Sequence, residues 1–278
     1  MKQPHKARIP STTASPPDAG HPNDVNVEAC DRRGTLNLKE DDGGADMTST
    51  ANHKKTTARM LTLAMAALVA LGASACTVVE GNGTIVEETR PVSDFIEIEA
   101  SDDFIVDVRV DPAMKGPFEV RVTGDENLVQ YVETQQIGRR LVLSQRPGFW
   151  LQPSQDIRID LRVPSLSTLE ARGGVLIAAR GFRQRRLRVL AADHSRVRLE
   201  GEVDALNVVA TGSAQVEAQH LITWLTRVDA AQNAHAQVCV EENLDAIASG
   251  DATIAYSCSP FSVYEEVHDH ALVVRARY

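Results

Sequence analysis

The stretch LNVVATGSAQV, residues 206–216, decides the fold. Its apolar residues alternate up to Ala210, small and turn-forming residues follow, and an apolar residue returns at Val216. Alternation with period two is typical of a strand with one buried face, and glycine and serine favour the intervening turn. The stretch therefore predicts a strand, a turn and a second strand.

The same pattern recurs along the C-terminal half of the chain. The second positions of its turns, spaced 18 to 20 residues apart, are Gly173, Asp193, Gly212, Gln232, Gly250 and Asp269. A unit of about nineteen residues cannot enclose a core alone, so successive units must stack. The repeat predicts an all-β protein, a β-solenoid in which equivalent residues of neighbouring coils lie about 4.8 Å apart.

Composition limits both the core and the class of partner. The chain has 278 residues, 43% of them hydrophobic and only 4% aromatic, which suits narrow stacked coils of aliphatic residues. Its formal net charge of -9 argues against a nucleic-acid binder, which would need a broad basic surface. We therefore expect a folded domain and no nucleic-acid partner.

The N-terminal quarter has the composition of a leader. Residues 1–46 are rich in polar, proline and glycine residues, and we expect this segment to be disordered and to precede the true start at Met47 or Met60. Residues 47–75 contain a basic patch, a short apolar run and small residues at the end, as a secretory signal peptide does. The apolar run is too short to span a membrane.

Cys76 follows this signal directly. Residues 71–76, LGASAC, resemble a bacterial lipobox, which would make Cys76 an acylated N-terminal residue. The pattern departs from the common lipobox at Ala73, and ordinary signal peptidase would cut the same bond and leave a soluble protein. If the chain is lipidated, Thr77 favours the outer membrane. We expect an exported bacterial protein, an outer-membrane lipoprotein or one of the periplasm or cell surface, with residues 76–80 as a short tether and 81–278 as one domain.

Three segments of this domain carry a resemblance to a known family. They are GNGTIVEETRPVSDF at 81–95, DENL at 125–128 and the strand 159–163, followed by the repeated turns. With these features the chain resembles the putative auto-transporter adhesin head GIN domain, a bacterial exported domain of unknown function. The resemblance implies a right-handed parallel β-solenoid, often in a lipoprotein, although here few of the turns keep their glycines.

Two cysteines stand one repeat apart. Cys239 and Cys258 are separated by nineteen residues, so they fall in the same or adjacent columns of neighbouring coils. The expected spacing of about 4.8 Å between their Cα atoms suits a disulfide, and an exported protein meets oxidising conditions. We predict the disulfide. Two buried free cysteines are the alternative if the columns are displaced.

Two groups of residues are candidates for binding. An arginine band stands out on this acidic protein and could contact a polyanion; its members are Arg180, Arg183, Arg185, Arg186, Arg188, Arg196 and Arg198. It could equally be a solvated strand face that prevents edge pairing. Phe149 and Trp150, in the expected loop 146–154, could stack on a glycan or form a lid on the end of the solenoid.

Catalytic and metal signals are weak. His194 and His270 share a turn position but lie four coils apart, too far to bind one ion. Asp251 and Asp269 could approach each other on neighbouring coils, yet aspartate at a turn is ordinary.

The sequence therefore predicts a non-catalytic, adhesin-like interaction module of the envelope or surface, with no catalytic residues, no cofactor and no metal. Its expected partners are envelope polysaccharide, lipopolysaccharide or another surface protein, and it would meet the membrane only through a lipid anchor. A carbohydrate-active β-helix enzyme and a purely structural envelope protein are the alternatives.

Overall fold

A computed structural model describes residues 76–115 and 118–276 of the chain. The segment 1–46, expected to be disordered, and the signal peptide expected over 47–75 lie outside the described residues. Every described element is a β-strand except one short 3-10 helix, η1 (Val129–Tyr131). In this part of the chain no helix has the length and apolar character needed to cross a membrane.

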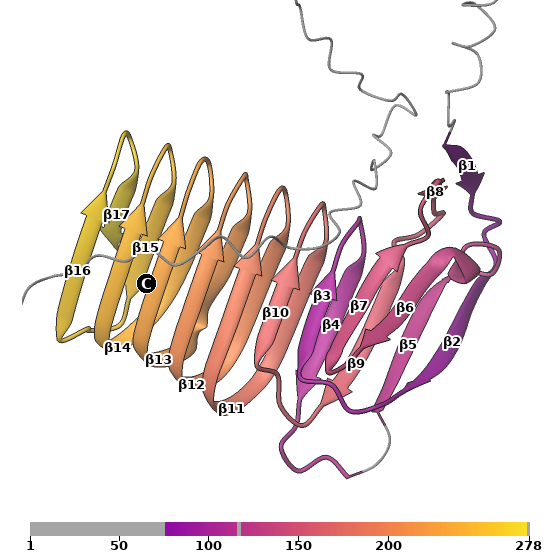
Figure 1. Ribbon diagram of the computed structural model, residues 1–278, viewed down its shortest axis with the longest axis horizontal. Coiled ribbons are helices and arrows are strands. Elements are labelled where there is room, and N and C mark those ends of the chain that lie inside the picture. The colour runs from indigo at the N-terminus through magenta and orange to yellow at the C-terminus, as the bar shows by residue number, and fades with distance from the viewer. Residues whose placement is uncertain (1–75, 116–117, 277–278) are drawn as a thin grey trace, which may run out of the picture.

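The C-terminal half forms the predicted solenoid, with its coils stacked side by side (Figure 1). Its strands are β10 (Thr168–Ala171), β11 (Leu176–Ala191), β12 (Arg196–Ala210), β13 (Gln215–Ala230), β14 (His235–Ala248), β15 (Thr253–Ser257), β16 (Ser262–Val267) and β17 (Leu272–Arg275). Each pairs in parallel with its neighbours. The protein is therefore a right-handed parallel β-solenoid with a repeat of about 20 residues, which confirms the predicted fold class.

Each long strand bends midway and so contributes to two faces of the coil. We call the segments before the turns the front face: 168–171, 186–191, 205–210, 225–230, 243–248 and 262–267. We call the segments after the turns the back face: 105–110, 176–180, 196–200, 215–218, 235–239, 253–257 and 272–275. The two faces enclose the core between them.

The N-terminal layers close one end of the stack. Strands β3 (Glu97–Ala100) and β4 (Ile105–Val110) form the coil that pairs with β10 and β11. Next to it lie β9 (Arg158–Val163) and β7 (Arg140–Gln145), which pair in antiparallel fashion with β5 (Phe118–Asp125) and β6 (Val132–Ile137). Strand β2 (Ile85–Val92) pairs with β5 in turn. This mixed sheet covers the edge that the first coil would otherwise expose.

The segment after Cys76 is also attached to the domain. Residues Thr77–Glu80 form β1, which pairs in parallel with β8 (Phe149–Gln152) as a separate two-stranded sheet. The segment expected as a tether, 76–80, thus contains a paired strand, and so does the expected loop 146–154. Local sequence could not show this pairing, because the two strands lie far apart along the chain.

A buried carboxylate joins these N-terminal segments. The fully buried side chain of Asp125 accepts hydrogen bonds from the amides of Gly83 (2.7 Å) and Ser154 (2.9 Å) and from the Ser154 hydroxyl (2.7 Å). Burial alone would raise the pKa of Asp125, but the hydrogen bonds from Ser154 and Gly83 outweigh it and hold this pKa below its usual value.

A neighbouring amide completes the same junction. Asn127 accepts a hydrogen bond from the Asn82 amide (2.9 Å) and donates one to the Glu80 carbonyl (2.7 Å). The segments 81–83 and 125–127, which stood apart in the sequence as two motifs, therefore bind each other.

The turns form a ladder along one side of the solenoid. Their second residues all have left-handed backbone, with φ between 60° and 72°: Asp102, Gly173, Asp193, Gly212, Gln232, Gly250 and Asp269. From Gly173 onward, glycine alternates with aspartate or glutamine. At Gly212 a Cβ atom would lie 3.0 Å from the backbone of Asp193 on the preceding coil, so a side chain fits poorly there.

The side chains of the intervening aspartate and glutamine residues accept hydrogen bonds from backbone amides of the preceding coil, and these bonds favour the left-handed backbone. Asp193 accepts a hydrogen bond from the Gly173 amide at 3.0 Å, and Gln232 accepts one from the Gly212 amide at 2.7 Å. Asp269 accepts one from Gly250 in the same way. Each such side chain lies over the glycine of the preceding coil. The alternate turns that have aspartate or glutamine in place of glycine therefore keep the same left-handed conformation, and the ladder of turns is continuous.

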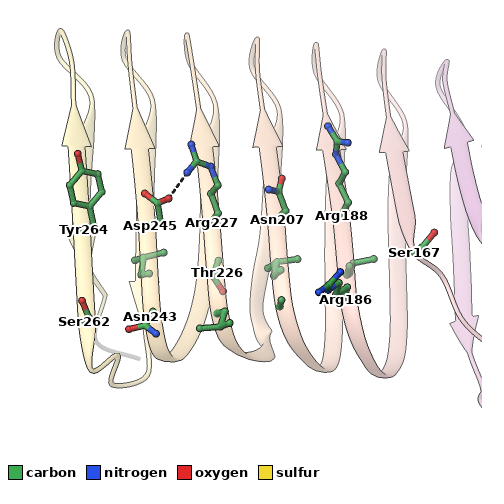
Figure 2. Close-up of a pocket in the computed structure, with 15 residues that line it drawn as sticks. Ser167, Arg186, Arg188, Asn207, Thr226, Arg227, Asn243, Asp245, Ser262 and Tyr264 are labelled. Carbon is green, nitrogen blue, oxygen red and sulfur yellow. Dashed lines mark hydrogen bonds and ion pairs between the residues drawn. The ribbon is translucent and has the colours of Figure 1, made fainter. Parts of the chain in front are cut away.

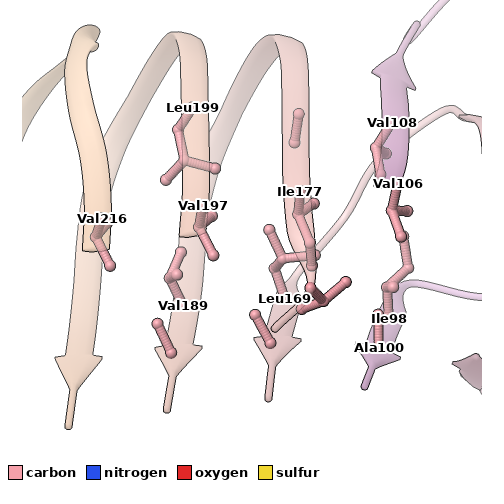
Figure 3. Close-up of a cluster of buried hydrophobic side chains, with 14 of the residues drawn as sticks. Ile98, Ala100, Val106, Val108, Leu169, Ile177, Val189, Val197, Leu199 and Val216 are labelled. Atoms are coloured by element: carbon pink, nitrogen blue, oxygen red, sulfur yellow. The ribbon is translucent and has the colours of Figure 1, made fainter. Parts of the chain in front are cut away.

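The core consists of columns of aliphatic side chains that run along the stack (Figure 3). One column on the front face contains Ile98, Leu169, Val189, Val208 and Val228, and a facing column on the back contains Val106, Ile177, Val197 and Val216. In the last coil the front column ends at the exposed Glu265, in register with Ala246. A charge in an inward column opposes the addition of a further coil.

Cys239 and Cys258 form the predicted disulfide. Their Cα atoms are 5.2 Å apart, and the bond joins the back face of one coil to the bend that ends the next. Cys258 has left-handed backbone at the point where β15 ends. The bond therefore restrains the connection to β16 and the last coil.

Replacement of both cysteines by alanine is expected to lower the free energy of unfolding by about 3 kcal/mol, because the unfolded chain regains the freedom of a loop of about twenty residues. Urea unfolding at equilibrium measures this loss. The variant Ser257→Ala, next to the bond and partly exposed, is the control. A double variant as stable as the native protein would contradict the prediction.

Candidate functional site

A shallow groove of about 780 Å³ crosses the front face from β10 to β16 (Figure 2). Two rows of outward side chains follow it, two residues apart on each strand. One row comprises Arg188, Asn207, Arg227, Asp245 and Tyr264; the other comprises Arg186, Ala205, Leu225, Asn243 and Ser262. Between the rows lie the buried residues Leu187, Leu206, Thr226 and Leu244.

The front-face register explains why these residues gather. Each coil places one residue of each row at the same height, because the parallel strands pair without a shift along this segment of the face. Asn207, Leu225, Asn243 and Tyr264 escaped notice in the sequence, although they recur at the period of the turns. Extending the repeat to its outward positions would have identified them.

Charge is distributed unevenly along the groove. Arg186 and Arg188 are exposed at the β11 end, and among the described residues neither has a carboxylate within ion-pair distance. Further along, Arg227 is bonded to Asp245 on the next coil (Figure 2). Asp245 is the one acid among the described residues that line the groove. One end of the groove is therefore positively charged, and the rest of the groove is nearly neutral.

The arginine band does not form one patch. Arg186 and Arg188 lie on the front face, whereas Arg196 and Arg198 follow the turn and lie on the back face. Arg198 donates to Glu217 on the next coil at 2.7 Å, and this hydrogen bond raises the pKa of Arg198. Arg196 donates to Gln215 at 3.0 Å.

The remaining arginines lead from the back face to the groove. Arg180 ends the back-face segment of β11, and Arg183 and Arg185 lie on the bend before Arg186. None of these three has an ion-pair partner among the described residues. Glu200 and Glu202 are in register with Arg180 and Arg183 but form no ion pair with them; the negative charge of Glu200 contributes to the raised pKa of Arg198.

A second hollow of about 710 Å³ lies beside the turns of the first coils. Trp150 lines it together with Asp103, Arg172, Asp193 and His194. Phe149, the preceding residue of β8, packs instead against Tyr131, with ring centroids 4.6 Å apart. The two aromatic residues therefore differ in position: Phe149 covers the N-terminal layers, and Trp150 lines the hollow beside the turns.

The turn histidines and aspartates take part in turn contacts. His270 and Asp251 approach each other at 3.8 Å on the exposed turn side. In the described part of the chain, the one cluster close enough to hold a metal is Cys239, Cys258 and Glu241. Its two sulfurs are already bonded to each other, which leaves one carboxylate.

Fold and surface together define a capped β-solenoid with one long groove across a flat face, a class of repeat protein that presents extended surfaces. Residues 94–260 match the family described as "Putative auto-transporter adhesin, head GIN domain". The chain belongs to this family.

Solved structures share the fold. A crystal structure of a putative adhesin from Bacteroides fragilis matches 71% of this chain and all of its own, with a TM-score of 0.58 and 15% identity. A putative adhesin from Parabacteroides merdae and a putative lipid binding protein from Parabacteroides distasonis each match over 72% of this chain and all of their own, both with a TM-score of 0.49, at 19% and 16% identity. No curated protein matches the chain.

Proposed function

We propose that this protein is a non-catalytic exported interaction module that binds molecules of the bacterial envelope or of another surface through its front face. The family is described by adhesin-like members, which supports a place outside the cell. The observation that carries the proposal is the groove, because it joins a long accessible surface to arginines that have no ion-pair partner among the described residues.

The unpaired arginines give this surface its attraction for anions. Arg180, Arg183, Arg185, Arg186 and Arg188 all lie on β11, so they wrap one coil from the back face around the bend and into the groove. A guanidinium group without a protein partner can form two parallel hydrogen bonds with a carboxylate, sulfate or phosphate. Repetition of weak contacts along a stack then gives useful overall affinity.

The groove favours binding over glycan cleavage. Cleavage of a glycosidic bond ordinarily requires two carboxyl groups on either side of the bond. Asp245 is the only acid among the described residues of the groove, and it is paired with Arg227. This arrangement supports recognition without catalysis.

Attachment to a membrane through acylated Cys76 is a separate part of the proposal. The sequence LGASAC at 71–76 supports it. The intact mass of the exported protein tests it: a diacylated or triacylated N-terminal cysteine is the expected result, and an unmodified mature chain would contradict it. Fractionation of the envelope then tests the proposed outer-membrane location.

The binding proposal is tested on an array of glycans, lipopolysaccharides and surface proteins. We expect the native protein to bind part of the array, and the variant with all five unpaired β11 arginines changed to serine to lose about tenfold or more in affinity. The control changes Arg196 and Arg198 to serine, because these residues lie on the back face. Absence of binding to every probe would refute the proposal.

A further inference from the structure

We infer that the groove binds an extended acidic glycan that lies across the coils, with its acid groups on Arg186 and Arg188 and a sugar ring on Tyr264. This inference rests on the proposed function and specifies the ligand class of the same site. It follows from the dimensions of the groove, from the order of its side chains and from the character of its floor.

The dimensions suit a polymer. The groove extends over the front-face strands from β11 to β16 and reaches Ser167, just before β10; at about 4.8 Å per coil it is about 24 Å long. This strand spacing is close to the length that one pyranose residue adds to an extended glycan. Successive sugar rings would therefore meet successive coils in equivalent positions. A compact small molecule would contact only a fraction of this surface.

The cationic end suits an acid group. Arg186 and Arg188 are two residues apart on one strand and point to the same face, about 6.6 Å apart along the chain. Both are exposed, and neither has an ion-pair partner among the described residues. A carboxylate or sulfate on a sugar would satisfy a guanidinium group with two parallel hydrogen bonds.

The middle of the groove suits hydroxyl groups. Asn207 and Asn243 line the middle part of the groove. An amide side chain both donates and accepts hydrogen bonds, as a sugar hydroxyl does. Arg227 and Asp245 neutralise each other there. Neutral, hydrogen-bonding groups thus separate the arginines from the far end.

The far end suits the apolar side of a sugar ring. The Tyr264 side chain is 59% exposed on the last coil, and Leu225 is 46% exposed two coils before it. Ligand-binding clefts are commonly lined by apolar and aromatic side chains together with a few polar groups. The aromatic ring offers a flat face to a sugar ring, while the Tyr264 hydroxyl donates a hydrogen bond to Glu266 on the same strand (3.5 Å).

Other classes of ligand fit less well. A nucleic acid would need positive charge along the whole course, but the chain carries a net charge of -9 and the groove is cationic at one end only. An acyl chain would need an enclosed apolar cavity, whereas packed aliphatic columns fill the interior of the solenoid. These ligands are therefore outcomes that the test must distinguish.

The test measures affinity by titration calorimetry with two acidic probes, oligogalacturonides and heparin-derived oligosaccharides, from dimers to octamers. Neutral cello-oligosaccharides of the same lengths and phosphatidylglycerol vesicles are the comparison ligands. Three variants of the full chain are compared: Arg186→Ser with Arg188→Ser, Tyr264→Ala, and Arg196→Ser with Arg198→Ser. The last removes the same charge from the back face, outside the groove, so it is the matched control.

We expect the native protein to bind at least one acidic series, with affinity that rises with length until the glycan spans the groove. The Arg186 and Arg188 pair should lose about tenfold or more, Tyr264→Ala about threefold or more, and the back-face pair less than about threefold. Thermal unfolding of each variant, unchanged within a few degrees, shows that the losses come from the site.

Four results would overturn the inference. Equal losses in the groove pair and the back-face pair would indicate non-specific attraction. Neutral glycans that bind as tightly as acidic ones would remove the role of the arginines. Binding to vesicles or to array proteins but to neither acidic series would refute the glycan while the proposed function stands. Binding to nothing at all would refute both.

Discussion

Replacement of Gly201 by alanine is expected to lower the free energy of unfolding by about 3 kcal/mol or more. A Cβ atom at this position would lie 2.5 Å from the Phe182 carbonyl oxygen and 2.6 Å from the Phe182 nitrogen, on the preceding coil. The backbone of Gly201 is also left-handed, with φ of 134°. Overpacking against backbone and left-handed strain therefore add together.

The two contributions can be separated with a second glycine. Gly138 has φ of 62°, and a Cβ atom there would meet nothing within 4 Å. Gly138→Ala should therefore cost only the conformational strain, about 1 kcal/mol. Urea unfolding at equilibrium measures both variants. Equal losses at the two positions would show that close packing of the bends does not limit this solenoid.

Asp125→Ala should cost a similar amount, about 3 kcal/mol. The substitution removes the buried carboxylate that accepts hydrogen bonds from the amides of Gly83 and Ser154 and from the Ser154 hydroxyl, and hydrogen bonds to a charged group contribute about 1.5–3 kcal/mol each. Asp125→Asn keeps the shape and part of the bonding, so it should lose less than Asp125→Ala. Asp94, whose side chain is largely exposed, is the control, and Asp94→Asn should stay within about 0.5 kcal/mol.

The same residue predicts a pH dependence. The pKa of Asp125 is lowered in the folded protein, so its contribution is present above the pKa of the unfolded chain, about 3.9, and is lost as the pH falls through the folded pKa. The native protein should therefore lose stability below about pH 4 more steeply than Asp125→Asn does. Identical pH profiles for the two proteins would contradict this role.

Local sequence was enough for the coils of the fold. The period of the turns fixed the number of residues in a coil, and alternation fixed which residues, such as Val189 and Val208, face inward. The disulfide followed from the same arithmetic, because residues one repeat apart must be neighbours in a stack. These are local or periodic properties, so a single chain displays them directly.

The site was only partly accessible to such reasoning. The seven arginines stand out in the sequence as one band, and alternation places Arg186 with Arg188, and Arg196 with Arg198, outward on two strands. The repeat also predicts the turn around Asp193, but only the structure shows that this turn separates the two pairs onto opposite faces. Alternation shows on which side of its own strand a residue lies, but it does not show whether that strand belongs to the front face or to the back face.

The sequence by itself determined the repeat, the buried columns, the disulfide and the polar turns, because each depends on residues that are close along the chain or separated by one period. The tertiary structure alone decided that β1 pairs with β8 and that Asp125 holds the segment 81–83. These contacts join segments that lie far apart along the chain and outside the repeat, and no local or periodic pattern encodes such long-range pairing.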